Sequence, residues 1–154
     1  MLEVLVISIS KPLLIGVYHN KKLIKIYKEE GKTSDILPTI FQKILDEYDL
    51  STIYYVNTPG SYMAIKVSYV FLKTISITKK IELKACSGFE FNKNSPIKAL
   101  GKKYFINEDS DKSKDVKVDF LDKDTKIHDF ELPNVIDDIK YSSKTLPIYN
   151  LPAV

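Results

Sequence analysis

Short apolar runs separated by polar turns fill the first 30 positions of the chain. Leu2–Ser10 alternates and is rich in β-branched residues, Leu13–Tyr18 has the same character, and Leu23–Tyr27 follows a polar turn at residues 19–22. Runs of this kind, bounded by turn residues, are typical of β-strands. The pattern therefore predicts three strands joined as an antiparallel meander.

The spacing of the apolar residues becomes helical after Ser34. From Ile36 to Tyr48 they recur at intervals of three and four, with polar residues on the opposite side, as in an amphipathic helix. Ser34 or Asp35 is the expected N-cap, and Pro38 is compatible with the helix only in or near its first turn. The apolar run Thr52–Val56 then predicts a short, buried strand.

A second helix is predicted from Tyr62 to about Ser76, after a turn at Asn57–Ser61 in which Ser61 is the expected N-cap. Apolar side chains surround nearly the whole helix and leave a narrow polar wedge at Lys66 and Lys73. A helix that is apolar on all sides must be buried on more than one side. One side must cover the sheet, and we expect the other to bind a second protein chain, because so short a chain has little left to cover it.

A strand predicted at Ile81–Cys86 completes the order β-β-β-α-β-α-β, in which right-handed crossovers make the later strands parallel. The character of the chain changes after this strand, beginning with a polar connection at Asn92–Pro96. Further strands are predicted at Lys102–Ile106, Val116–Leu121 and Leu146–Asn150. We place a boundary near residues 90–96, which gives a first lobe at residues 1–90 and a reduced second lobe at residues 91–154.

Composition narrows the class of protein. The 154 residues are 44% apolar and 28% charged, as in a soluble globular protein. The apolar stretches are far shorter than the roughly 20 residues of a membrane span, and the chain opens in a strand without the basic start of a secretory signal, so we expect a cytoplasmic protein. A lone cysteine, Cys86, and two histidines far apart in sequence, His19 and His128, predict neither a disulfide nor a metal site. No cofactor is expected.

The charge of the chain argues against direct nucleic-acid recognition. All 23 basic residues are lysines, they are mixed with 20 carboxylates, and the net charge is +3. Without arginine, bidentate recognition of phosphate or guanine is not available. We therefore expect any direct binding of nucleic acid to be weak, with the lysines forming a solvated surface.

Five short motifs occur in an order that is found in one known family. Thr58–Val67 (TPGSYMAIKV) is similar to the signature G-P-G-S-F-T-G-[LV]-R-[IV], and Leu5–Ser10 lies in the place of an opening L-A-I-D-T-S strand. Thr33–Pro38 is similar to the helix start H-[ST]-x-x-L-L-P, Gly101–Phe105 to a G-E-V-Y strand, and Pro147–Pro152 to a closing P-x-Y-L-R-x-P. Together they resemble the TsaB (YeaZ) family, which implies an α/β fold of the actin-like and ribonuclease-H-like type.

The resemblance implies a non-catalytic scaffold that binds a TsaD-type transferase. In that family the chemistry, the metal and the threonylcarbamoyl-adenylate substrate belong to the partner, together with an accessory ATPase, TsaE. The product is N6-threonylcarbamoyladenosine at position 37 of tRNA, which this chain would contact only indirectly. A homodimer is an alternative use of the same surface. The expected interface residues are Tyr62, Ile65, Tyr69, Val70, Leu72 and Lys73, with some contribution from the first helix.

Departures from the family pattern concern phosphate binding. Ser8 stands where actin-like ATPases place an aspartate that holds Mg²⁺, and Thr58 and Ala64 replace family glycines. Phosphate cradling needs a glycine-rich backbone and a metal-holding carboxylate, so no catalytic residue is expected. The main alternative is a small actin-like ATPase or phosphotransferase that binds a nucleotide phosphate at the turn formed by Thr58, Pro59, Gly60 and Ser61.

Two other activities are disfavoured. A serine or cysteine nucleophile needs a base within hydrogen-bond reach, but of the candidates Ser61, Ser87 and Cys86 the first is the expected N-cap and the last a buried apolar residue. A ribonuclease-H-like nuclease needs clustered carboxylates, and only Glu3 lies on the first strand. Five other acidic residues are expected to lie in solvated loops, namely Asp109, Asp111, Asp115, Asp137 and Asp138.

Overall fold

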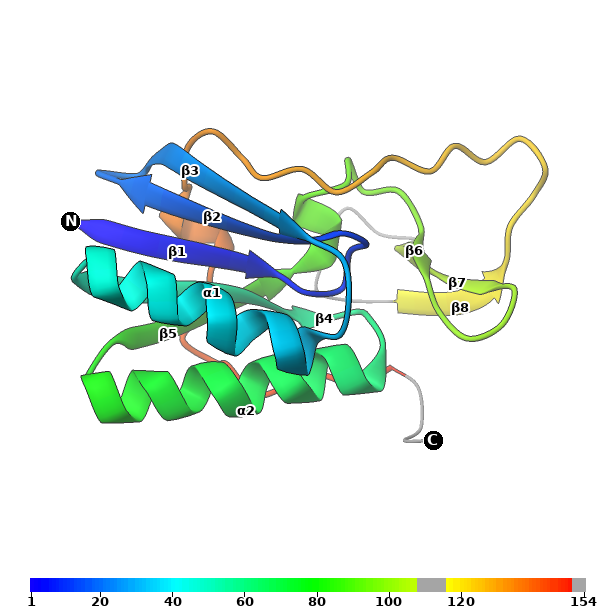
Figure 1. The fold of residues 1–154 in the computed structure, drawn as a ribbon. Helices are drawn as coiled ribbons and strands as arrows, with labels where there is room; N and C mark the ends of the chain where they lie inside the picture. The colour runs from blue at the N-terminus through cyan, green and yellow to red at the C-terminus, as the bar shows by residue number, and fades with distance from the viewer. Residues whose placement is uncertain (108–115, 151–154) are drawn as a thin grey trace.

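The computed structural model describes residues 1–107 and 116–150. Its main sheet has five strands in the order β3-β2-β1-β4-β5 (Figure 1). They are β1 (Leu2–Ile7), β2 (Leu13–His19), β3 (Lys22–Glu29), β4 (Leu50–Thr58) and β5 (Glu82–Ser87). The first three strands pair antiparallel, whereas β4 runs parallel to both β1 and β5. The predicted meander and the predicted parallel strands are both confirmed, and the fold is mixed α/β.

Two helices, α1 (Thr33–Glu47) and α2 (Tyr62–Lys79), lie side by side on one face of this sheet (Figure 1). Their inward side chains, such as Phe41 and Leu72, pack on Val4 and Ile53 of the sheet in the largest hydrophobic cluster. Burying each such side chain stabilises the fold by about 1.5–3 kcal/mol. Among the described residues, no helix combines the length and the apolar character that a membrane crossing requires.

The start of α1 differs from the prediction. The N-cap is Lys32, whose carbonyl accepts hydrogen bonds from the N–H groups of Asp35 and Ile36 (3.0 Å each), and no side chain caps the helix. Ser34 and Asp35 are therefore inside the helix, and their predicted capping role was wrong. Because the helix begins earlier, Pro38 lies in its second turn, where the missing N–H removes one intrahelical hydrogen bond.

A second, smaller sheet follows β5 and the short 3₁₀ helix η1 (Gly88–Glu90). It consists of β6 (Ile97–Lys98), β7 (Lys103–Asn107) and β8 (Val116–Phe120), paired antiparallel in that order. Phe89, Ile97 and Phe105 form its small core. The predicted strands near 102–106 and 116–121 are confirmed, while the division of the chain at residue 90 stays a prediction.

Residues 130–150, which we call the strap, cover the second face of the main sheet. The strap contains only the short 3₁₀ helix η2 (Asp138–Lys140), and its side chains Leu132, Ile136 and Tyr141 pack on that face. It crosses the sheet from edge to edge (Figure 1), because it pairs with Lys22 at the start of β3 and with Ala85 of β5. An irregular segment thus forms the layer opposite the two helices.

The predicted terminal strand Leu146–Asn150 does not form. This part of the strap runs beside the end of β4, where the Ile148 N–H donates to the Asn57 carbonyl (3.1 Å) and the Asn57 side chain donates to the Leu146 carbonyl (2.9 Å). Pro147, between them, has no N–H to donate. A single backbone hydrogen bond to β4 therefore replaces the predicted ladder.

Candidate functional site

The start of α2 is fixed by the turn that carries the family signature. Ser61 is the N-cap as predicted, since its Oγ accepts a hydrogen bond from the Ala64 N–H (3.2 Å). Thr58 and Pro59 are buried, and the Thr58 hydroxyl donates to the Asn150 side chain of the strap (2.9 Å). The turn thus ties the end of β4 to both the helix and the strap.

Gly60 is required in this turn for packing. A Cβ at this position would overlap Cγ2 of Ile9, and it would also crowd Ile65 at 3.3 Å. Ile9 lies just after β1, so the missing side chain of Gly60 lets the β1–β2 loop pack directly on the head of α2. This close contact explains the glycine without a bound phosphate.

One narrow stripe of α2 faces the sheet. Ile65, Ser68 and Leu72 are buried, and the Ser68 hydroxyl donates to Oγ of Ser8 (2.6 Å) at the end of β1. Ile65 and Leu72, expected at a partner interface, are 0% exposed within this chain. They support the helix from beneath, so any partner must bind to its other side chains.

The opposite side of α2 exposes large apolar residues. Met63, Val70 and Ile77 are 60%, 55% and 67% exposed, and their spacing of seven residues places them on one side of the helix. We call these three residues the α2 stripe. The chain therefore buries one apolar side of α2 and leaves the opposite apolar side exposed.

A groove of about 430 Å³ lies between the α2 stripe and the first half of α1. We call it the α1–α2 groove. Its floor includes Leu37 and Phe71, and Phe71 packs edge-on against Phe41 with ring centroids 5.7 Å apart. Leu37 and Pro38 of α1 extend the apolar surface, whereas Lys66 and Thr74 supply its polar rim. Some contribution from the first helix was expected, but its residues could not be named in advance, because contacts between helices do not follow from the pattern of one helix.

The remaining expected interface residues lie beside this groove. Tyr62 is half-buried, and its ring centroid is 4.5 Å from that of Tyr149 in the strap. The Lys66 ammonium lies 5.6 Å from the centroid of the Tyr62 ring. Tyr69 is half-buried on the side of the core, 6.2 Å from the Tyr55 ring, and Lys73 is partly exposed. Of the six expected residues, Val70 is the one with a large exposed surface.

A larger cavity, of about 940 Å³, lies where the β1–β2 loop meets the starts of both helices and the segment 96–99. Lysines Lys11, Lys32 and Lys98 line it, and it brings Ser61 and His128 to the same hollow. The position of His128 could not be predicted, since it is distant from Ser61 along the chain. Asp129 is the only carboxylate among the described residues of its lining, so no cluster of acids is available to hold Mg²⁺.

The candidate nucleophiles have structural roles. Cys86 is buried, and desolvation raises the pKa of its thiol well above the ordinary value. Ser87 caps η1 by accepting the Phe89 N–H (3.3 Å). Within residues 1–107 and 116–150, neither histidine side chain is hydrogen-bonded to a serine or cysteine, and no group of three metal-binding side chains occurs.

Two acidic residues expected in solvated loops have defined partners. Asp137 caps η2 by accepting the Ile139 N–H (3.4 Å), and Asp138 forms an ion pair with Lys21 (2.8 Å), although both remain exposed. The hydrogen bond from Lys21 lowers the pKa of Asp138. The other three, Asp109, Asp111 and Asp115, lie outside the described residues, as do Leu151 and Pro152 of the closing motif.

Comparison with known proteins gives a likeness of fold. No protein-family model matches the sequence, and no curated protein matches it. YeaZ from Pseudomonas aeruginosa superposes on 86% of this chain with a TM-score of 0.59 at 11% identity. An uncharacterized protein described as similar to peptidase YEAZ from Pseudomonas aeruginosa superposes on 86% with a TM-score of 0.55 at 9% identity.

The chain spans 64% of the length of each of these two structures. It has a YeaZ-like fold, and the resemblance seen in the sequence motifs is confirmed at that level.

Proposed function

We propose that this chain is a TsaB-type scaffold, which binds a TsaD-type transferase through α2 and the α1–α2 groove. The observation that carries the proposal is the α2 stripe, whose large apolar side chains remain exposed on the side of the helix opposite its buried residues. Exposed apolar surface of this extent beside a groove is typical of protein interfaces. The YeaZ-like fold and the signature turn at the head of the same helix support the choice of partner.

In this proposal the chain has the first-lobe topology of actin-like and ribonuclease-H-like proteins, with a reduced second lobe, and performs no chemistry. The transferase forms N6-threonylcarbamoyladenosine on tRNA, a TsaE-type ATPase joins through the complex, and tRNA contacts this chain only indirectly. The absence of a carboxylate at Ser8 and the packing role of Gly60 agree with a non-catalytic subunit. The word peptidase in one neighbour's description has no counterpart here, since Cys86 is buried and Ser61 caps a helix.

The test is a reconstituted modification reaction. Adding this chain to a TsaD-type transferase should raise the amount of threonylcarbamoyl adenosine formed on tRNA, whereas the Val70→Asp variant should not. Sedimentation of the chain alone, with and without the same substitution, shows whether the α2 stripe also forms a homodimer. If the wild-type chain and the variant give the same modification rate, the proposal is wrong.

The second candidate is an actin-like ATPase or phosphotransferase, and the 940 Å³ cavity is the observation in its favour. Its lysines and the Ser61 hydroxyl could hold a nucleotide phosphate beside the signature turn. Titration calorimetry with ATP and Mg²⁺ separates the two functions. Two results would favour the enzyme. The wild-type chain would bind ATP and hydrolyse it at a steady rate, and a Lys11→Met, Lys32→Met double variant would give no heat of binding.

A further inference from the structure

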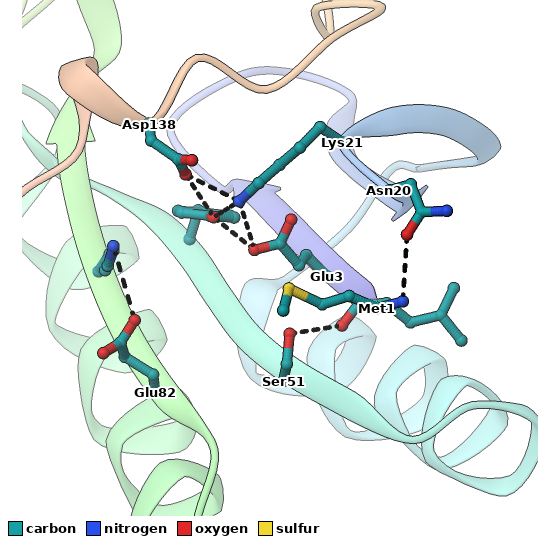
Figure 2. Close-up of polar contacts among 10 residues, drawn as sticks. Met1, Glu3, Asn20, Lys21, Ser51, Glu82 and Asp138 are labelled. Carbon is teal, nitrogen blue, oxygen red and sulfur yellow. Dashed lines mark hydrogen bonds and ion pairs between the residues drawn. The ribbon is translucent and has the colours of Figure 1, made fainter.

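Lys21 joins the strap to the main sheet. Its ammonium Nζ lies 2.9 Å from Oε2 of Glu3 on β1 and 2.8 Å from Oδ1 of Asp138 in the strap (Figure 2). The Tyr54 hydroxyl of β4 donates to the same Glu3 oxygen (2.6 Å) and accepts from Lys21 (3.0 Å). We call these four residues the Lys21 cluster. One cation is thus shared between a carboxylate of the sheet and a carboxylate of the strap.

The two carboxylates of the Lys21 cluster have very different surroundings. The Glu3 side chain is 2% exposed, and its second oxygen, Oε1, has no hydrogen-bond partner among the described residues. The Asp138 side chain is 56% exposed. A buried charge needs its partner, whereas an exposed ion pair is weak and is screened by salt. The Lys21–Glu3 pair is therefore the stronger of the two, and the Lys21–Asp138 pair is the one that breaks first.

The other ties of the strap are single contacts spread along its length. The Tyr18 hydroxyl donates to the Pro133 carbonyl (2.7 Å), that of Tyr54 to Asp138 Oδ1 (3.3 Å) and that of Tyr55 to the Thr145 carbonyl. A second ion pair joins Lys140 to Glu90 (3.3 Å). At the β3 edge the Leu23 N–H donates to the Asn134 carbonyl and the Ile136 N–H to the Lys21 carbonyl (2.9 Å each). At the β5 edge Ala85 and Ser142 exchange two hydrogen bonds of 2.8 Å, and Ile148 bonds to Asn57 (3.1 Å). Between these points only Ile136 and Tyr141 are anchored in the core of that face. The preceding residues, 122–129, are all exposed, so the strap can move without displacing β8.

We propose that residues 134–148 open and close over the sheet as one cooperative unit, for which the Lys21–Asp138 ion pair is the latch. In the open state Lys21 keeps its bond to Glu3, and Glu3 Oε1 gains water. The other cation that acts on Asp138, Lys84 of β5, pairs instead with Glu82 (3.6 Å). Opening would also loosen the contact of Tyr149, the residue after this unit, with Tyr62 at the head of α2, and any effect of this on a partner rests on the proposed function of that helix. The opening itself does not depend on any partner.

Amide hydrogen exchange of the free chain, resolved by NMR, tests the latch. The reporters are the five N–H groups that join strap and sheet, those of Leu23, Ala85, Ile136, Ser142 and Ile148. In the wild type these five amides should exchange faster than the central amides of β1 and β4. All five should give the same equilibrium constant for opening, and this constant should rise as NaCl is increased from about 50 to about 300 mM. Asp138→Asn should raise the exchange of all five by about two- to fivefold at low salt and reduce the salt dependence, of which the Lys140–Glu90 ion pair (3.3 Å) retains a part.

Glu131→Gln is the matched control, because it removes an exposed carboxylate of the strap away from the Lys21 cluster. It should leave all five rates unchanged. Faster exchange of Leu23 and Ile136 alone in Asp138→Asn would mean local fraying and would overturn the cooperative unit. The latch would be overturned if the five reporter amides exchanged as slowly as those of β1, or if Asp138→Asn and Glu131→Gln had equal effects on their exchange. Because no partner is present, these results are independent of whether the proposed function is correct.

Discussion

Replacing Lys21 by methionine tests the ion pair that this residue forms with the buried Glu3 carboxylate. The substitution keeps the length of the side chain but leaves the Glu3 carboxylate, 2% exposed, with only the Tyr54 hydroxyl as a partner. Removing one partner of a buried ion pair destabilises a protein by about 3–5 kcal/mol. Because the Lys21 side chain is 31% exposed, we expect the lower end, about 3 kcal/mol. At about 2–4 °C per kcal/mol for a chain of this size, Tm should fall by about 6–12 °C.

Urea unfolding followed by circular dichroism measures this effect directly. The midpoint should fall for Lys21→Met while the slope stays constant, since the surface exposed on unfolding is unchanged. A second substitution, Glu3→Gln, removes the buried charge and should restore most of the lost stability. Lys22→Met, at an exposed neighbouring position, is the control and should change stability by at most about 0.5 kcal/mol. A loss below about 1 kcal/mol for Lys21→Met, or no recovery in the double variant, would refute the reasoning.

Three further predictions concern other parts of the chain. Gly60→Ala should destabilise the fold by about 1–3 kcal/mol in the same urea assay, because the added Cβ collides with Ile9; unchanged stability would mean that the turn can relax. Cys86 should react with a thiol reagent only in denaturant, since burial raises its pKa and blocks access, and rapid labelling of the native chain would contradict this. Stability should fall in acid as pH drops through the lowered pKa of Asp138, because the stabilisation from that pair is present above the ordinary aspartate pKa. A urea midpoint for Asp138→Asn that varies with acid pH as the wild type does would show that another group is responsible.

The sequence predicted the main sheet well because its strands and helices have distinct apolar spacing. The signature turn was equally informative, since Ser61 is the N-cap that a serine before an apolar run predicts. At α1 the local signal failed, because Ser34 and Asp35 are good capping residues while the backbone of Lys32 makes the cap. Capping preferences of this size, about 1 kcal/mol, are easily outweighed by tertiary packing.

The strap was largely unpredictable. Its contacts with Lys21, Ala85 and Asn57 join residues that are distant along the chain, and its backbone has no period that indicates what it covers. The same limitation affected the expected interface. The helical wheel showed that α2 is apolar on all sides, but it could not show that Ile65 and Leu72 face the sheet while Val70 faces outward. Orientation about the helix axis became clear only from the packing.

Calorimetric titration of a TsaD-type transferase with the wild-type chain, Val70→Asp and Thr78→Asp tests the scaffold proposal most directly. Val70 lies in the α2 stripe, and Thr78 is an exposed position on the same helix that lies outside the α1–α2 groove. Equal Tm values for the three proteins would establish that the fold is intact. We predict binding by the wild type and by Thr78→Asp with similar affinity, and a Kd at least about tenfold weaker for Val70→Asp, a difference of about 1.4 kcal/mol. No binding by the wild type, or the same Kd for all three, would contradict the assignment of α2 as the partner surface.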